Sequence, residues 1–427
     1  MLLKMNNVGR LKPVEVKIDG LTVICGNNNT GKSTIGKTMY CIFNAFYDIE
    51  TNINREKSSL IVRYLASQIQ DRRSSKRIVL EQSIKELLEI DVPSKKEIRT
   101  ALDDVFRRVN AEPMQTSIQE IVDEIQRILS VDEKEVVTAF LKRILEAEFE
   151  QNFGNVNHPR KKTSVDLTIK DQHISFFVRG SNSALKIEQY ISLEKQMIYL
   201  EDPFILDHIN DLNYLLHDWR SYGHSYQVGA KIRSGKLHKG QTHAVEEVLR
   251  SQKLKEIIDK INHISDGDMI VEDGKIMYRH ASMKKSLGIS NLSTGVKTFL
   301  ILKELLLNGD LEENGIMVID EPEVHLHPEW QIKFAEVIVM LQKAYGLNII
   351  LTTHSMDFLS ALITYAKQYD IENSCNYYLT QLDDDVKEEE MSLAQLIWMN
   401  NDIQGLFASV SEPFEKLYQQ MDLGDEI

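Results

Sequence analysis

The stretch Gly26-Asn27-Asn28-Asn29-Thr30-Gly31-Lys32-Ser33 reads G-x-x-x-x-G-K-S, the pattern of a phosphate-binding loop. The apolar run Leu21–Cys25 before it predicts a buried strand, and Thr34–Phe46 after it has the length and apolar spacing of a helix. Strand, loop and helix in this order form the context that the motif requires. An ordinary glycine-containing turn is disfavoured because both the motif and its context are complete.

Each residue type in this loop suits the binding of nucleotide phosphates. Gly26 and Gly31 let the backbone curl, so that its N–H groups can point at phosphate oxygens. The N-terminus of the following helix adds its dipole and free N–H groups. Lys32 would bring positive charge to the β- and γ-phosphates, and the Ser33 hydroxyl would bind Mg²⁺, which prefers oxygen ligands. The residues predicted to bind ATP here are Gly26, Asn27, Asn28, Asn29, Thr30, Gly31, Lys32, Ser33 and Thr34.

Composition indicates a globular protein with room for two or three domains. The chain has 427 residues, of which 42% are hydrophobic, and a net charge of −14. This charge argues against a broad basic surface for nucleic acid. The three cysteines lack paired metal-ligand spacing and no signal peptide is evident, so we expect a reducing cytoplasm and no disulfide framework. No apolar run has the length of a membrane span, so no membrane association is expected.

The first segment predicts antiparallel strands, and the next predicts a helical insertion. Met1–Ile24 contains the alternating stretch Val14–Ile18, followed by the turn residues Asp19-Gly20. From Asp48 to Gln151, charged residues are dense and apolar residues recur at helical spacing. A capping box at Ser130–Glu133 is predicted to start the last of these helices. We expect an all-helical lobe or short arm.

The middle of the chain returns to strands. Val165–Ile169 and His173–Val178 predict a hairpin. Gln196–Leu200 predicts a further strand, which ends at Glu201–Pro203, a turn or helix start. Asp273-Gly274 lies between two apolar runs and predicts a second, tight hairpin.

Gly229–His243 is interpreted as a mobile basic loop, because Lys231, Arg233, Lys236 and Lys239 occur there among glycines. A solvated surface loop is the simpler interpretation. A nucleic-acid contact is the alternative, since such contacts draw on clustered lysines and arginines.

Two later stretches supply further candidates for an ATP site. Leu292–Lys297 opens a predicted helix that stops at Gly309, and Ser293 is a good helix cap. Ile316–Pro322 predicts a buried strand that ends in two acids. Asp320 is placed to hold Mg²⁺ or its water, and Glu321 to orient or deprotonate an attacking water.

Two histidine features follow these acids. His325 and His327 have the spacing of a metal-binding pair, but no third ligand is apparent, so a structural or interface role is favoured. Asn348–Thr353 predicts another buried strand with His354 at its carboxyl end. Parallel sheets place their chemistry at those ends, so we predict that His354 contacts the γ-phosphate.

Together the phosphate loop, L-S-x-G, D-E-P-E-x-H-L-H-P and T-T-H-S resemble, in this order, the ABC-type ATPases of the SMC-like branch. The D-E-P-E-x-H-L-H-P version is similar to the overcoming-lysogenization-defect (OLD) group and to ATPases of bacterial anti-phage systems. This resemblance implies an α/β fold, an ABC-type P-loop ATPase head with N-terminal antiparallel strands and a large helical insertion. The expected regions are an ATPase core at 1–47 and 265–385, a helical insertion at 48–160, a mixed segment at 161–264 and a helical tail at 386–427.

The resemblance also implies a head-to-tail dimer or higher oligomer, in which each ATP lies between one chain's Lys32 loop and the other chain's Ser293 and Gly295. By the same resemblance Asp320 is the Walker B acid, Glu321 the catalytic carboxylate and His354 the switch histidine. Catalytic roles are thus expected for Glu321, His354 and Lys32, Mg²⁺ binding for Ser33 and Asp320, and slow ATP hydrolysis overall. Thr294 and Val296-Lys297 depart from the glycine and glutamine of transporter motors. Neither the family's glutamine between the two halves nor its base-stacking aromatic can be located.

The end of the chain predicts an ATPase without its own nuclease. After Thr353 we expect a helix, a strand at Asn376–Leu382, a solvated acidic turn at Asp383–Glu390 and a helical tail at Met391–Met421. The apolar face predicted for that tail carries Leu393, Leu396, Ile397 and Trp398. Many OLD-type ATPases continue into a TOPRIM nuclease, so the chain is most like the Septu ATPase type, PtuA, which pairs with an HNH nuclease encoded nearby.

Two functions are therefore considered. The first is an anti-phage ATPase that controls a separate effector nuclease through ATP-dependent dimerisation. The second is a DNA-repair or recombination ATPase that acts directly on DNA. A transporter motor is disfavoured, because neither the signature motif nor the helical insertion suits that design.

Overall fold

The structure is a computed structural model that describes residues 1–68, 84, 94–109, 116–150, 152–179, 184–211, 223–237, 254–383 and 393–422. The chain forms two compact units. The first contains residues 1–44, 141–191 and 195–427, and the second contains residues 45–140 and 192–194.

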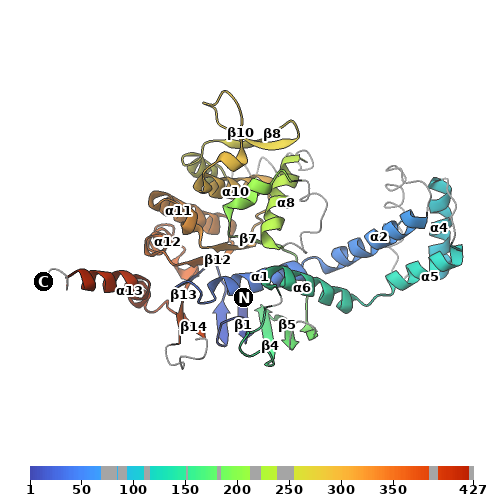
Figure 1. The fold of residues 1–427 in the computed structure, drawn as a ribbon, viewed down its shortest axis with the longest axis horizontal. Helices are drawn as coiled ribbons and strands as arrows, with labels where there is room; N and C mark the ends of the chain where they lie inside the picture. The colour runs from blue at the N-terminus through green and yellow to red at the C-terminus, as the bar shows by residue number, and fades with distance from the viewer. Residues whose placement is uncertain are drawn as a thin grey trace. The chain divides into compact units, whose positions relative to one another are not determined.

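A six-stranded sheet lies at the centre of the first unit, in the order β14-β13-β3-β12-β11-β7 (Figure 1). Its first five strands in chain order run parallel to their neighbours, and β14 alone is antiparallel, on β13. The carboxyl ends of the parallel strands therefore share one edge. The strands are β3 (Leu21–Gly26), β7 (Met197–Leu200), β11 (Ile316–Asp320), β12 (Asn348–Thr353), β13 (Cys375–Leu382) and β14 (Ala394–Trp398).

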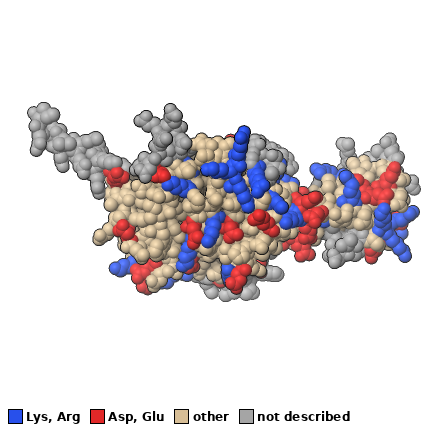
Figure 2. Space-filling view, turned by 90° about the horizontal axis from the view of Figure 1, so that it is seen from below, with Lys and Arg blue, Asp and Glu red and all other residues tan. Residues whose placement is uncertain are grey.

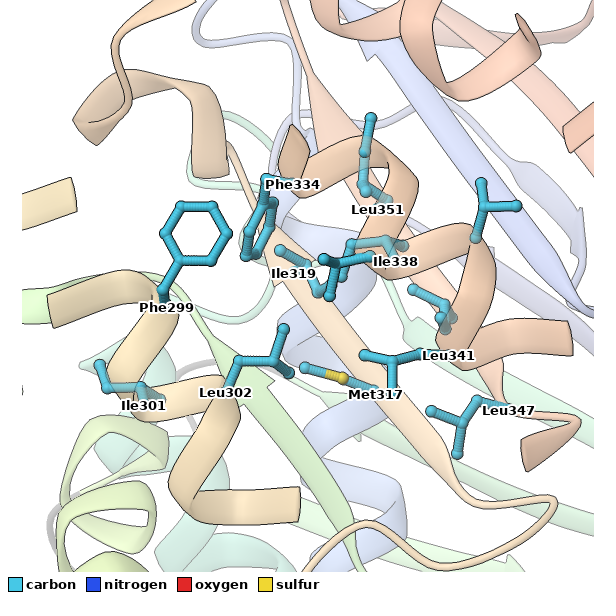
Figure 3. Close-up of a cluster of buried hydrophobic side chains, with 14 of the residues drawn as sticks. Phe299, Ile301, Leu302, Met317, Ile319, Phe334, Ile338, Leu341, Leu347 and Leu351 are labelled. Atoms are coloured by element: carbon cyan, nitrogen blue, oxygen red, sulfur yellow. The ribbon is translucent and has the colours of Figure 1, made fainter. Parts of the chain in front are cut away.

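Helices cover both faces of this sheet. Successive side chains of β11 point to opposite faces, and all five are buried. Met317 and Ile319 point to one face, where they join a core with residues of α10 (Thr294–Asn308), α11 (Pro328–Tyr345) and α12 (Met356–Gln368) (Figure 3). Val318 points to the other face, beneath α1 (Lys32–Ala45). Burying a side chain such as Leu302 or Phe334 contributes roughly 1.5–3 kcal/mol, so this core fixes the helices to the sheet.

Two antiparallel sheets complete the first unit. One has the order β2-β1-β4-β5-β6, and the other has the order β10-β9-β8. Their strands are β1 (Leu2–Asn6), β2 (Val14–Lys17), β4 (Thr163–Ile169), β5 (Gln172–Arg179), β6 (Ala184–Gln189), β8 (Asp268–Glu272), β9 (Lys275–Arg279) and β10 (Leu287–Gly288). Both predicted hairpins, β4–β5 and β8–β9, are confirmed; Asp273 and Gly274 join the second with φ of 50° and 73°. Further helices of this unit include η1 (Pro203–His208), α8 (His224–Leu237), η3 (Ile289–Asn291), η4 (Pro322–His325), η5 (Glu372–Ser374) and α13 (Ile403–Asp422).

The second unit is helical and has its own core. Its helices include α2 (Ile49–Gln68), α4 (Lys95–Val109) and α5 (Ile118–Leu129), while α6 (Glu133–Phe149) has residues in both units. Buried residues at helical spacing form the core, among them Ile61, Leu65, Ile98, Leu102, Ile121 and Ile125. The predicted α/β class is confirmed, with a mainly parallel central sheet, N-terminal antiparallel strands and a helical insertion.

The capping box predicted at Ser130–Glu133 is wrong. Ser130 ends α5, and α6 is capped instead by Asp132, whose Oδ1 accepts a hydrogen bond from Glu135 N at 3.1 Å. The capping box of this region lies at Ser117 and Glu120, which start α5. Ser130 lies three residues before the first residue of α6, and Asp132 occupies the cap position next to the helix.

The basic loop predicted at Gly229–His243 is also wrong, because residues up to Leu237 form α8. Lys231 pairs with Asp310 at 3.3 Å, Lys236 pairs with Glu304 at 2.7 Å, and Arg233 donates to Ile209 O. Glycine and lysine content suggested a loop, but tertiary pairing of the cations overrides that local preference. Lys239 lies outside the described residues.

The tail is predicted to be largely helical, and this holds only for its second part. Leu396, Ile397 and Trp398 belong to β14, which pairs with β13, and α13 follows. β13 would otherwise present an open strand edge, and pairing satisfies its backbone groups. Of the acidic run, Asp383 pairs with Lys12, and 384–390 lie outside the described residues. Within the described part of the chain, no helix is long and apolar enough to cross a membrane.

Candidate active site

The phosphate loop joins β3 to α1 and holds a conformation that depends on its glycines. Gly26, Asn29 and Gly31 have positive φ values of 141°, 64° and 88°. A Cβ on Gly26 would lie 2.3 Å from Thr380 O, and one on Gly31 would lie 2.7 Å from the Leu11 side chain. Close approach as well as φ therefore restricts both positions to glycine.

Residues distant in sequence hold the phosphate loop in place through hydrogen bonds. Thr30 Oγ1 donates to Asn27 O at 2.7 Å and lies 2.6 Å from Thr380 Oγ1, in β13. Arg10 Nη1 donates to Asn29 O at 2.9 Å. Sequence reasoning missed Arg10 and Thr380, since neither belongs to a motif and each reaches the loop only through the fold.

Lys32 is almost completely buried, and its ammonium group is held by three oxygens. Nζ donates to Gly26 O at 2.8 Å and to Asn27 O at 2.9 Å, and it lies 3.0 Å from Glu321 Oε1. The loop lysine and the second strand-end acid are therefore direct neighbours. Phosphate oxygens arriving at the loop would compete with Glu321 for this cation.

Asp320 ends β11, and both of its carboxylate oxygens accept hydrogen bonds from neighbouring strands. The Tyr199 hydroxyl donates to Oδ2 at 2.6 Å, and the Thr352 hydroxyl donates to Oδ1. Tyr199 lies in β7 and Thr352 in β12, the two strands that flank β11. Asp320 is thus held rigidly in a buried position.

Glu321 follows Asp320 and leaves the strand in a left-handed conformation, with φ of 45°. Such a backbone is uncommon for a residue with a side chain, and it costs on the order of 1 kcal/mol or more. Its N–H group donates to Thr352 O at 3.2 Å and to Thr352 Oγ1 at 3.1 Å, which supports the turn. The turn directs the carboxylate toward Lys32 rather than into the sheet.

His354 follows β12 and stands between two carboxylates. Its Nδ1 lies 3.6 Å from Glu321 Oε2 and 3.4 Å from Glu323 Oε1. Glu323 is buried and accepts hydrogen bonds from Thr353 Oγ1 at 2.6 Å and from His354 N at 2.8 Å. Burial raises the pKa of Glu323, although these hydrogen bonds oppose the effect. Sequence reasoning assigned no role to Glu323, which orients the loop that carries His354.

Ser33 and Thr34 begin α1 and line a hollow of about 490 Å³ together with Lys37. Its other walls come from Ala147, Glu148, Phe149, Glu150, Asn152, Gly223, His224 and Ser225. The Ser33 hydroxyl and the Asp320 carboxylate, at the same sheet edge, are hard oxygen donors. That donor set fits Mg²⁺, which takes oxygen ligands and retains waters.

A buried charge network borders this hollow. His224 Nδ1 lies 2.8 Å from Glu148 Oε2, and His224 Nε2 lies 2.8 Å from Glu201 Oε2. Burial lowers the pKa of His224, but the hydrogen bonds to both carboxylates outweigh it and raise the pKa to about 9. The hydrogen bond to His224 lowers the pKa of Glu201, which also lies 3.6 Å from Lys37. The network thus carries an imidazolium at neutral pH.

Ser293 and Gly295 lie at the start of α10, where Ser293 is the N-cap residue. A Cβ on Gly295 would lie 2.8 Å from the Trp330 ring, so this end of α10 packs against the start of α11. Among the described residues, no hydrogen bond joins Ser293–Gly295 to the phosphate loop of the same chain. The fold gathers Lys32, Asp320, Glu321 and His354, but it leaves the α10 residues apart from them.

The histidine pair after β11 has structural contacts. His327 accepts a hydrogen bond from Glu329 N at 3.4 Å as the cap of α11, and the His325 ring lies edge-on to Phe204. Within the described ranges, no group of three or more His, Cys, Asp or Glu side chains could hold a metal ion. The preference for a structural role is consistent with these contacts.

Exposed charge on the first unit is mixed rather than uniformly basic. Figure 2 shows basic and acidic side chains beside one another on the face seen from below. Lys4 lies 3.0 Å from Glu15, and Lys162 lies 3.6 Å from Glu188. Such pairing weakens a local positive field and gives little support to a nucleic-acid interface there.

Comparison with known proteins identifies a family and two named relatives. Residues 1–359 match the family model described as an AAA ATPase domain. A retron Ec83 probable ATPase from Escherichia coli is 31% identical over 164 residues, which cover 35% of this chain and 25% of that protein. A retron Vc95 probable ATPase from Vibrio cholerae serotype O1 biovar El Tor is 33% identical over 102 residues, 21% of this chain and 19% of that protein. The similar stretches thus span a quarter or less of either relative.

Similar solved structures include two SMC head domains. An SMC head bound to the C-terminal winged-helix domain of ScpA aligns with a TM-score of 0.41 and 11% identity, covering 94% of this chain and 98% of that one. The SMC head domain from Thermotoga maritima aligns with a TM-score of 0.37 and 10% identity, covering 93% of this chain and 98% of that one.

Proposed function

The chain belongs to the AAA ATPase domain family, and from this premise we propose that it binds ATP with Mg²⁺ at the carboxyl edge of the central sheet and hydrolyses it to ADP and phosphate. One observation carries the proposal. Lys32 Nζ lies 3.0 Å from Glu321 Oε1, and His354 Nδ1 lies 3.6 Å from Glu321 Oε2. A cation, a carboxylate and an imidazole therefore meet beside the phosphate loop, where they could bind a terminal phosphate and orient an attacking water.

Each residue of the site would have a separate role in hydrolysis. The loop N–H groups and Lys32 bind the phosphates, and this draws the ammonium of Lys32 away from Glu321. Glu321 is then free to orient the attacking water and accept its proton. His354, positioned by Glu323, contacts the γ-phosphate. Bound Mg²⁺ supplies positive charge to the phosphates, and Ser33 and Asp320 hold it.

Loss of Lys32 tests the binding step. Lys32→Ala should abolish ATP binding measured by isothermal titration calorimetry, because it removes the buried cation of the loop. Lys333→Ala, which removes an exposed lysine paired with Glu329, is the matched control and should bind ATP as the wild type does. Retained tight binding by Lys32→Ala would contradict the assignment of the loop.

We further propose that a second chain completes each site. Ser293 and Gly295 lie at the start of α10, where Gly295 packs against Trp330 of α11 and neither residue is hydrogen-bonded to the described phosphate loop. The side chains of Phe204, Val324 and Met356 are exposed near the strand-end acids, in keeping with a covering protein surface. Slow turnover is expected of a single chain, because its own α10 residues cannot act on its own ATP.

Mixing two inactive variants tests this arrangement. Lys32→Ala disables one component of the site, and Ser293→Arg disables the other. In a head-to-tail dimer of the two variants, one site is doubly damaged and the other contains only wild-type components. Hydrolysis should therefore reappear on mixing: each mixed dimer has one intact site of two, and half of the dimers are mixed when equal amounts exchange freely, so roughly a quarter of the wild-type rate is expected. No recovery, with dimers present by sedimentation, would contradict a shared site.

We propose that the biological role is anti-phage defence, with the ATPase controlling a separate effector nuclease. The support is that both named relatives are probable ATPases of retrons. A nuclease encoded nearby, such as an HNH protein, is the expected partner, and the likeness to the Septu type, PtuA, stays a prediction. The DNA-repair alternative loses support, because Lys231, Arg233 and Lys236, its suggested contacts, are paired within the fold.

Purification with the native neighbouring genes separates these roles. A tagged chain should carry a nuclease in a fixed ratio, identified by mass spectrometry, and DNA alone should leave its ATP hydrolysis rate unchanged. Strong stimulation by DNA without any protein partner would favour the repair role instead.

A further inference from the structure

Tyr199 contacts the candidate site from a strand that carries no recognised motif. It lies in β7, pairs in register with Val318 of β11, and has a fully buried side chain. Its hydroxyl lies 2.6 Å from Asp320 Oδ2. Thr352, which pairs in register with Asp320 from the opposite strand, donates to the other oxygen. The two strands beside β11 therefore clamp the same carboxylate.

The phenol acts as a hydrogen-bond donor here, because the carboxylate beside it offers acceptor oxygens. A hydrogen bond from a neutral donor to an ionised acceptor is shorter and stronger than one between neutral groups.

The ring of Tyr199 is fixed from three sides. A Cβ on Gly36 of α1 would lie 3.1 Å from its Cε2 and 2.8 Å from Val318 Cγ1, so α1 lies directly on the ring. The Tyr40 ring lies edge-on at 6.1 Å, and the His224 ring lies 4.3 Å away, centre to centre. His224 is itself held by two carboxylates, as described above. These contacts hold the ring, and with it the hydroxyl, beside Asp320.

We propose that Tyr199 is a positioning residue, which fixes Asp320 in the one orientation that serves the divalent cation of the ATP site. This inference rests on the proposed function, in which Asp320 helps to hold Mg²⁺. Each carboxylate oxygen has two acceptor positions, so a hydrogen bond to each leaves further positions for the cation or its water. Without the phenol, Asp320 Oδ2 would be buried and unsatisfied, and the side chain could rotate.

Tyr199→Phe removes only the hydroxyl and leaves the packing of the ring. The affinity for Mn²⁺, measured by electron paramagnetic resonance with a saturating slowly hydrolysed ATP analogue, should fall about tenfold, while analogue affinity in EDTA stays unchanged. Tyr378→Phe is the matched control. It removes a hydroxyl from another buried tyrosine of the same sheet, one that accepts a hydrogen bond from Lys17 N at 2.8 Å. That control should bind Mn²⁺ as the wild type does.

A double variant distinguishes positioning from general loss of structure. If Tyr199 acts through Asp320, adding Tyr199→Phe to Asp320→Asn should weaken Mn²⁺ binding no further. A further loss of Mn²⁺ affinity in the double variant, or wild-type Mn²⁺ affinity in Tyr199→Phe, would overturn the inference and leave the proposed function intact. If the wild-type protein does not bind the ATP analogue, either with Mn²⁺ or without it, the proposed function is wrong, and the inference fails with it.

Discussion

The sheet edge of the first unit and the helical surface of the second use charge in opposite ways. At the edge, Lys32 and Asp320 are each 3% exposed, and both have fixed hydrogen-bond partners. On the helices, pairs such as Arg127 with Glu124 are 76% and 31% exposed. Buried charges are costly unless paired, so those at the sheet edge are held by specific partners, whereas exposed pairs mainly keep a surface solvated.

The largest expected effect is on the backbone of the phosphate loop. Gly26→Ala places a methyl group 2.3 Å from the Thr380 backbone at a φ of 141°, so the loop must shift. We expect loss of ATP binding and a fall in the free energy of unfolding of about 3 kcal/mol or more. Gly274→Ala is the matched control, since its φ is 73° but nothing lies within 4 Å of the added Cβ. It should cost only about 1 kcal/mol and leave ATP binding intact.

Equal unfolding energies for these two variants in denaturant titrations would show that φ alone, and not the contact with β13, governs the loop. The close contact between the phosphate loop and β13 would then not distinguish the sheet edge from the rest of the molecule.

The buried network around His224 should make stability depend on pH. The pKa of His224 rises from its ordinary 6.5 to about 9, so the stabilisation is fully present below pH 6.5 and is lost as pH rises through 9. The groups that face it are Glu148, Glu201, Tyr40 and Tyr199. At about 1.4 kcal/mol per pKa unit, this loss is on the order of 3 kcal/mol.

His224→Gln should flatten this dependence in unfolding titrations between pH 6 and 10, because glutamine carries no titrating proton. His208→Gln, which removes an exposed histidine, serves as the control. If the free energy of unfolding depends on pH in His224→Gln as it does in the wild type, another group causes this dependence.

The smallest effect is expected on the helical surface. Arg127→Ala should give an unfolding curve that overlays the wild-type curve, because exposed ion pairs add little to stability. Ile125→Ala in the same helix removes a fully buried side chain and should cost about 2–5 kcal/mol. Comparable losses in the two variants would mean that the surface pairs of this unit are structural.

Sequence reasoning succeeded where the chemistry is local in the chain. The phosphate loop and the acids after β11 are contiguous motifs, and the parallel register that brings them together follows from strand–helix alternation. Tyr199 and Thr380 could not be found this way. Each contacts the site through sheet pairing with a strand more than a hundred residues away.

The errors have a physical cause as well. α8 contains glycines and lysines that favour a loop, yet buried acids such as Glu304 pair with its cations and stabilise the helix. β14 carries apolar residues whose spacing also fits a helix. This segment forms a strand because it pairs with the otherwise open edge of β13. In both regions a partner distant in sequence determines the local structure.

The central claim is that Glu321 performs hydrolysis at this edge, and a single-turnover measurement of ATP cleavage tests it most directly. Glu321→Gln should bind ATP but cleave it at least ~100-fold more slowly than the wild type, since it keeps the shape and loses the base. Glu329→Gln, a change to an exposed glutamate, should cleave at the wild-type rate. Wild-type cleavage by Glu321→Gln would contradict the assignment of the catalytic carboxylate.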